Sequence, residues 1–233
     1  MTSPATTPVL ATRTQAPVSA QTYGALINLS GRQRMLSQRI VLYTVLASQG
    51  DPAAAQTASE ALQTFLHSHE QLSRGGEGWP GAFSPALQRS FHGPQGADGP
   101  IRAFAELAAQ VLHEVAAVAP GAVLAVAVRG RLQALVEQAT PMLARLNALT
   151  QTFEAEAQLS ARARHTHLQA LIGRIDDVAR EARVVSFNAR LAATRAGESG
   201  REFAVVAQKL AQISEQIGDL AQQAARAGAD SRA

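Results

Sequence analysis

Apolar residues recur along most of this chain every three or four positions, which is the period of an α-helix. The periodic stretches predict helices at 22–48, 52–73, 101–119, 123–195 and 201–225. Gly- and Pro-rich segments separate these stretches, and the longest of them, 74–100, has room for one short helical turn at 85–90. Pro141 is the one interruption in the longest stretch, where a kink is possible. No useful length alternates with period two, so we predict no strands.

This order of elements predicts an all-α fold. Short connections between the first four long helices favour an antiparallel four-helix bundle, which continues into an antiparallel coiled-coil hairpin. We expect four segments along the chain. They are a disordered leader at 1–21, a helical-bundle domain at 22–156, a hairpin at 157–227 and a disordered tail at 228–233.

The predicted hairpin carries large apolar residues at alternating spacings of three and four, which is typical of a coiled-coil seam. The turn between its arms contains the glycines of "AGESG". Because each arm spans only a few heptads, we expect the hairpin to dimerise and so bury its seam. The seam residues are Leu168, Leu171, Ile175, Val178, Ala182, Val185, Ala189 and Ala192 in the first arm, and Phe203, Val206, Leu210, Ile213, Ile217 and Leu220 in the second.

Composition narrows the possible functions. The chain has no cysteine, which excludes disulfides and thiolate chemistry, and its longest apolar run, 122–128, is too short to span a bilayer. The N-terminus has neither the basic nor the apolar region of a signal peptide, so we expect a soluble, cytoplasmic protein without membrane insertion. The basic residues are scattered rather than clustered, which argues against nucleic-acid binding despite a pI near 10.1.

The first predicted helix has two faces of buried type. Leu29, Leu36, Ile40, Tyr43 and Ala47 are expected to fill the core of the bundle. On roughly the opposite side, Ile27, Gly31, Arg34, Gln38, Val41 and Val45 form a heptad stripe that is apolar at both ends and polar at its centre.

Arg34 is unusual on such a stripe, because a desolvated arginine needs a partner and no acidic residue occurs between Met1 and Gly50. If the stripe were a two-fold dimer interface, two copies of Arg34 would repel each other unless an anion lay between them. A guanidinium matches a planar oxyanion, and Gly31 would leave room for one. The alternative is that Arg34 extends to solvent at the edge of the stripe. Arg32 and Arg39 fall on a flank, as solvated residues or bridges to other helices.

The stretch "INLSGRQRMLSQRI", residues 27–40, resembles the signature of PilJ-type sensor domains of type IV pili chemotaxis transducers, which is also found as a variant in nitrate/nitrite sensor kinases. The resemblance implies a helical bundle that dimerises through its first helix. It also implies that an arginine from each subunit holds nitrate or nitrite. The matching arginine is Arg34, with Gly31 beside it, and we add Gln38 as a candidate ligand residue.

The stretch 188–214 is similar to the signalling tip of methyl-accepting chemotaxis proteins, around "RAGESGREFAVVA". This resemblance implies contacts with the chemotaxis histidine kinase and its coupling adaptor, with Arg195, Glu198, Arg201 and Val205 as candidate contact residues. The sequence departs from the family pattern at Ala192, Thr194 and Glu202. A plain dimerisation hairpin with a degenerate tip is therefore the alternative for this segment.

No catalytic constellation, metal-ligand cluster or cofactor motif is found, so we expect a protein that is not an enzyme. We interpret the pairs His67 with His69 and His165 with His167 as surface residues, since residues two apart cannot chelate one ion from one helix face. The combined expectation is a dimeric sensor that binds a small oxyanion and signals to a kinase and adaptor. The alternative is an interaction module, without a ligand, that modulates a receptor array or kinase.

Overall fold

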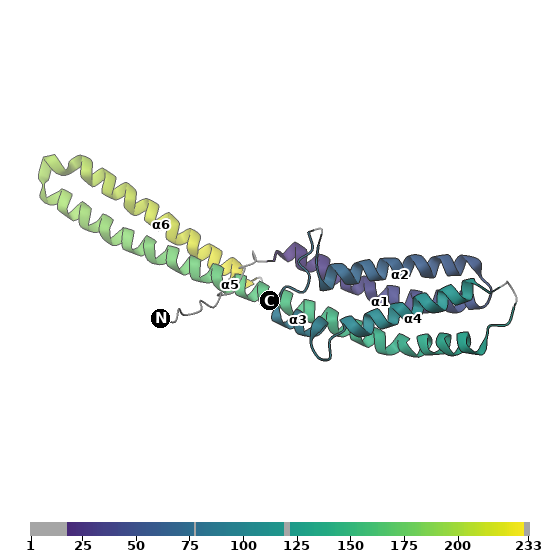
Figure 1. Ribbon diagram of the computed structural model, residues 1–233. Coiled ribbons are helices and arrows are strands. Elements are labelled where there is room, and N and C mark those ends of the chain that lie inside the picture. Colours follow the sequence, from purple (N-terminus) through teal and green to yellow (C-terminus); the bar gives the residue numbers. More distant parts are fainter. Residues whose placement is uncertain (1–17, 77, 119–121, 231–233) are drawn as a thin grey trace, which may run out of the picture. The chain divides into compact units, whose positions relative to one another are not determined.

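The computed structural model describes residues 18–76, 78–118 and 122–230, and every regular element within these ranges is a helix (Figure 1). This confirms the predicted all-α fold class. The expected leader and tail fall mainly on residues 1–17 and 231–233, which lie outside the described ranges. Helix α1 begins at Ala20 and α6 ends at Asp230, so the helical structure extends slightly beyond the expected limits at both ends.

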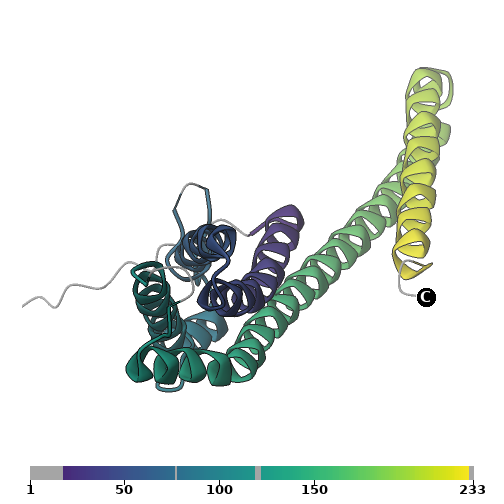
Figure 2. The ribbon, with the colours of Figure 1, turned by 90° about the vertical axis from the view of Figure 1, so that its right-hand side faces the viewer.

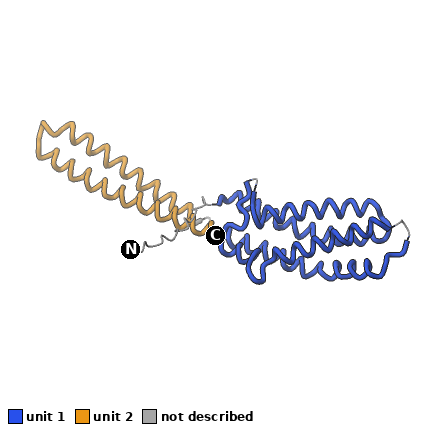
Figure 3. The backbone as a smooth tube through the Cα atoms, in the orientation of Figure 1, with its two compact units in different colours: residues 1–157 blue, residues 158–233 orange. Residues whose placement is uncertain are grey.

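The chain divides into two compact units, residues 1–157 and residues 158–233 (Figure 3). The division lies one residue from the expected boundary between the bundle and the hairpin. Helix α5, Val126–Arg195, supplies residues to both units and continues through Pro141 without a break.

The first unit contains α1 (Ala20–Ser48), α2 (Pro52–Ser73), α3 (Pro85–His92), α4 (Asp98–Ala116) and the beginning of α5. Three of these helices start at a polar side chain that accepts hydrogen bonds from free backbone N–H groups of the first turn. The caps are Ser19 for α1, Asp51 for α2 and Ser84 for α3, and α2 and α3 each have a proline in the first turn.

Helices α1, α2, α4 and the bundle part of α5 enclose one apolar core, seen nearly end-on in Figure 2. Each helix contributes fully buried large side chains to it, such as Ile40, Phe65, Phe104 and Leu146. Leu36, Ile40 and Ala47 of α1 are buried, as predicted, whereas Leu29 and Tyr43 are only partly buried.

The short helix α3 replaces the single turn expected at 85–90 and adds to the core rather than only bridging the loop. Its Leu87 and Phe91 are buried. The Phe91 ring meets that of Phe153 in α5 at 6.2 Å between centroids, in an edge arrangement. The Gly/Pro-rich segment therefore covers part of the core with a helix of its own.

The second unit consists of the distal part of α5, the 3₁₀ turn η1 (Gly197–Gly200) and α6 (Arg201–Asp230). Gly197 has a φ of +61°, a left-handed conformation that favours glycine at the end of a helix. The large residues of the predicted seam are not buried by this hairpin. The least exposed of these large residues is Leu171, at 37%, and the most exposed is Phe203, at 67%.

The side chains that this hairpin does bury are small, and they recur at every seventh residue. Ala193 and Ala207, Ser186 and Ser214, and Ala179 and Ala221 lie at equal separations on either side of Gly200, and all are buried. Small residues allow two helix backbones to approach closely. These six small residues, and not the large residues of the seam, therefore form the interior of the hairpin. Both serine hydroxyls donate to carbonyls one turn earlier, which satisfies them without a partner across the hairpin.

Gly200, midway between the two arms, has no space for a side chain. A Cβ there would lie 2.1 Å from the carbonyl oxygen of Ala193. We expect Gly200→Ala to destabilise the hairpin by about 1–3 kcal/mol, as overpacking does. Hydrogen exchange of the amides at 190–210 measures the effect.

The matched control is Gly173→Ala in α5, because nothing lies within 4 Å of a Cβ at that position. Alanine should stabilise the helix there by up to about 1 kcal/mol. Equal exchange in the Gly200→Ala variant and the wild-type protein would contradict the close approach at the tip.

Candidate functional site

A stripe of polar side chains on α1 meets α5 along the bundle. Ser30 and Thr150 are buried, with their hydroxyl oxygens 2.8 Å apart, and Thr150 donates to the carbonyl of Leu146. Ser30 is therefore the donor of this pair. Further along the same face, Gln38 Nε2 donates to the backbone oxygen of Ala139 at 3.2 Å.

Arg34 lies between these two contacts and is half-buried. Its Nη1 donates to Asn147 Oδ1 at 2.9 Å, and its Nη2 lies 3.4 Å from where a Cβ of Gly31 would be. The guanidinium therefore bridges α1 and α5 and lies close to the backbone of its own helix. Within the described ranges it forms no ion pair with a carboxylate, so its charge is balanced only by the dipole of a neutral amide.

The heptad stripe that we expected to face a second subunit contacts α5 of its own chain, and its place in a dimer interface stays a prediction. Arg34 and Gln38 bond to α5, Val41 is buried, and Ile27 packs against the core. The reason is that α5 closes the bundle beside α1, which sequence periodicity alone does not reveal. The structure thus places Gly31, Arg34 and Gln38 along the line where α1 meets α5. Their role as anion ligands stays a prediction.

A different face of α1 is exposed. It carries Arg32, Met35, Arg39 and Leu42, again at alternating spacings of three and four. Met35 is 54% and Leu42 56% exposed, and the Arg39 guanidinium lies 5.3 Å from the centre of the Tyr43 ring. The flanking arginines are therefore solvated, and the described part of the chain leaves the two large apolar side chains beside them more than half exposed.

The four candidate residues of the hairpin tip are all exposed. Arg201 Nη1 lies 3.4 Å from Glu198 Oε1, with both side chains more than three-quarters exposed. Val205 is 68% exposed, and Arg195 ends α5. The tip presents these side chains to solvent, where another protein could reach them.

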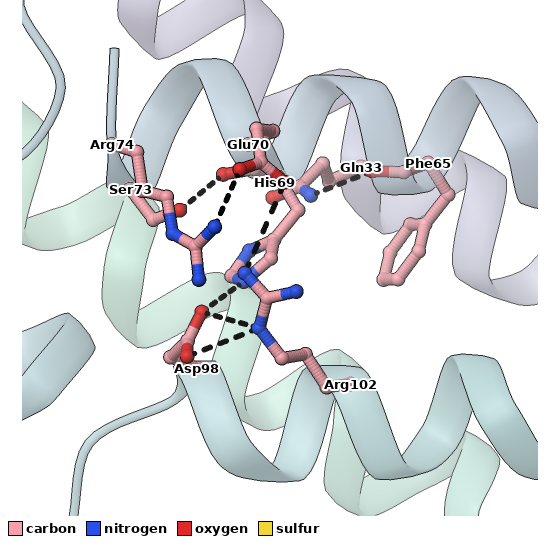
Figure 4. A network of polar contacts seen from close by, with 8 residues as sticks. All are labelled: Gln33, Phe65, His69, Glu70, Ser73, Arg74, Asp98 and Arg102. Atoms are coloured by element: carbon pink, nitrogen blue, oxygen red, sulfur yellow. Dashed lines mark hydrogen bonds and ion pairs between the residues drawn. The ribbon is translucent and has the colours of Figure 1, made fainter.

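The structure also contains a buried polar cluster that we did not predict (Figure 4). His69 of α2 is 1% exposed, so its interpretation as a surface residue was wrong. Its Nε2 lies 2.6 Å from Asp98 Oδ1, and Arg102 Nε donates to both oxygens of Asp98 at 3.2 Å. A count along α2 would have found it, because Ala58, Leu62, Phe65, His69 and Leu72 share one stripe.

The environment of this cluster shifts two pKa values. Burial lowers the pKa of His69, and the hydrogen bond to Asp98 offsets this only in part. Burial would raise the pKa of Asp98, but hydrogen bonds from His69 and Arg102 outweigh it and lower that pKa. The cluster therefore holds a neutral imidazole against an ionised carboxylate.

No group of three or more His, Asp or Glu side chains in the described ranges could hold a metal ion. None of the described helices is long and apolar enough to cross a membrane.

Comparison with known families finds a match within the first unit. Residues 19–114, from the cap of α1 to the last turn of α4, match the family model PilJ, "Type IV pili methyl-accepting chemotaxis transducer N-term". No curated protein and no solved structure was found to match the chain.

The match includes Gly31, Arg34 and Gln38 and supports the PilJ-type prediction for the bundle. It also supports a role in chemotaxis-type signal transduction. The matched residues end before α5, so neither Asn147 nor the hairpin tip lies within them. Similarity of the tip to methyl-accepting chemotaxis proteins stays a prediction.

The buried cluster yields a stability prediction. Asp98→Ala would leave the imidazole of His69 and the guanidinium of Arg102 without their shared acceptor, at a cost of about 2–3 kcal/mol. Urea unfolding followed by fluorescence of Trp79 measures this, because this tryptophan, the only one in the chain, packs against the core of the bundle.

Glu106→Ala is the control on the same helix, since Glu106 is exposed. We expect it to change the stability by less than about 0.5 kcal/mol. Equal stabilities of the two variants would show that the Asp98 contacts add nothing to the fold.

Proposed function

We propose that this chain is a sensor that binds a small planar oxyanion, nitrate or nitrite, at Arg34 and signals through the hairpin tip. The observation that carries the proposal is the environment of the Arg34 guanidinium. It is half-buried, it has no carboxylate partner among the described residues, and its strongest contact is a neutral amide. An anion would supply the missing charge, and a fork of N–H donors suits its planar oxygens.

The residues beside Arg34 offer further hydrogen-bond donors to such an anion. Asn147 accepts from Arg34 through its oxygen, which leaves its amide N–H groups for a ligand. Gly31 keeps the adjacent surface free of a side chain. Gln38 lies one turn further along α1, and its amide is already bonded to α5. Arg34 and Asn147 are therefore the principal ligand residues that we propose.

We further propose that the functional unit is a homodimer. Met35 and Leu42 on the outer face of α1 and the exposed seam of the hairpin are apolar surfaces that a second copy would cover. Gly31 and Arg34 are half-buried and Gln38 is exposed on the neighbouring face of α1, so a contact that extends from Met35 and Leu42 over Gln38 would bring the two Arg34 side chains toward the same interface. Their mutual repulsion would favour a bound anion, and binding would draw α1 and its partner together.

The output follows from the course of α5, which begins at Val126, meets Arg34 at Asn147 and ends at the tip with Arg195. We propose that a shift of α1 against α5 is passed along this helix. The exposed tip residues Arg195, Glu198, Arg201 and Val205 would then bind a chemotaxis histidine kinase and its coupling adaptor. The PilJ match in the bundle supports this signalling role at the level of the family.

Calorimetric titration with nitrate and nitrite tests the ligand site. We expect one anion for two wild-type chains and a loss of at least about tenfold in affinity for Arg34→Ala, from a lost charge-assisted hydrogen bond. Asn147→Asp should abolish binding as well, because a carboxylate would then pair with Arg34 and repel the anion.

Arg129→Ala is the control, because this exposed arginine near the start of α5 belongs to neither the Arg34 site nor the proposed dimer surfaces and should leave binding unchanged. Circular dichroism confirms that each variant is folded. The absence of heat with both anions in the wild-type protein would refute the sensor and favour the alternative, an interaction module without a ligand.

Binding of purified kinase and coupling adaptor to the immobilised full chain tests the tip. Glu198→Lys reverses the charge opposite Arg201, and Val205→Glu places a charge on an exposed apolar contact, so we expect each to reduce capture by at least about tenfold. Lys209→Ala, exposed one turn further along α6, should leave capture intact. Undiminished capture by both tip variants would leave the hairpin with a dimerisation role only.

A further inference from the structure

The buried cluster around His69 is not used by the proposed anion site, and its hydrogen bonding is incomplete. His69 lies on the core stripe of α2, and its ring is 5.9 Å from that of Phe91 in α3, measured between centroids. Asp98, its hydrogen-bond partner, is the first residue of α4. The contact therefore connects the first residue of α4 to a core residue near the end of α2. The Gly/Pro-rich segment lies between these two helices in the sequence.

Two buried atoms of this cluster have no hydrogen-bond partner in the part of the chain that the structure describes. They are His69 Nδ1 and Arg102 Nη2. With a neutral ring, Nε2 carries the proton and donates to Asp98, while Nδ1 is an acceptor without a donor. A second proton would therefore enter at Nδ1, inside the bundle. Buried polar atoms without a partner are rare and call for an explanation.

The guanidinium of Arg102 lies within 4 Å of two carboxylates, those of Asp98 and Glu70. Its Nε lies 3.2 Å from each oxygen of Asp98, and its Nη2 lies 3.9 Å from Glu70 Oε2. Glu70 also accepts from Arg74 at 2.8 Å and is half exposed. Figure 4 shows the Arg102 guanidinium between these two carboxylates, of which Asp98 is the nearer.

From this geometry we propose that His69, Asp98 and Arg102 form a proton-responsive latch at the start of α4. Protonation of His69 would place an imidazolium and a guanidinium on the same carboxylate. The two cations repel, so Arg102 would leave Asp98 for Glu70, and the first turn of α4 would lose the ion pair between Asp98 and Arg102 that stabilises it from within the helix. The latch would let the bundle respond to acid independently of Arg34.

The charged groups that face His69 set the direction of this response. They are Glu70 on its own helix and Asp98 and Arg102 on α4, whereas α3 contributes only an aromatic ring. Burial lowers the pKa of His69, and Asp98 and Glu70 oppose this while Arg102 adds to it. The unfolded chain therefore takes up this proton more readily than the folded one. Stability is highest above the ordinary histidine pKa and falls as the pH drops below it.

Hydrogen exchange of the amides at 101–105, the first in α4 that donate backbone hydrogen bonds, tests the latch at about pH 7.5 and about pH 5.5, on either side of the histidine range. After correction for intrinsic rates, we expect exchange to be faster in acid for the wild-type chain. His69→Gln keeps an N–H donor for Asp98 but cannot take up a proton, so this acceleration should disappear. His67→Gln, exposed on the same helix, should retain it.

NMR titration of the His69 ring keeps the test decisive even if a variant fails to fold. We expect a midpoint below the ordinary histidine value in the wild-type chain and a higher midpoint in Arg102→Gln, where Asp98 loses its other cation. A midpoint at or above the ordinary value in the wild-type chain would overturn the proposal. The same acid response in His69→Gln and wild type would also overturn it.

Discussion

The pairing of α1 with the bundle part of α5 is the interaction on which the rest of this structure depends. Ser30, Arg34 and Gln38 lie on a helix that must bury its apolar side, and each needs a polar partner once it leaves water. Helix α5 supplies all three partners, from Thr150 to Ala139, in antiparallel order. This pairing closes the core and places the Arg34 guanidinium beside Asn147, without an ion pair to a carboxylate among the described residues. The proposed ligand site is thus a consequence of how the bundle closes.

The two units solve the problem of packing helices in different ways. The bundle fills its core with large residues such as Phe65 and Phe104, whose rings meet at 5.9 Å between centroids. The hairpin packs its arms through Ala, Ser and Gly and leaves its large residues exposed. The bundle buries its large residues within one chain, whereas the hairpin leaves its large seam residues exposed. The ligand-binding and dimer-forming roles that we propose for the two units rest on this difference.

The sequence predicted the helices well because local physics sets their limits. Ser19, Asp51 and Ser84 cap free N–H groups, and Gly197 ends α5 in a left-handed conformation that other residues rarely adopt. It also singled out Arg34, since an arginine on an apolar stripe is visible in periodicity alone. It missed His69 because the residue type was weighed without its place on the stripe. It could not find Asn147, which is 113 residues from Arg34.

The sequence by itself determined where helices begin and end, and which residues share a face of each helix. These properties depend on neighbours within a few turns. Only the tertiary structure decided what each face meets. It turned the Arg34 stripe toward α5, paired His69 with Asp98 and made small residues the interior of the hairpin. The physical reason is that a heptad pattern states that a face is to be buried, while the identity of its partner depends on volume and polarity contributed by distant segments.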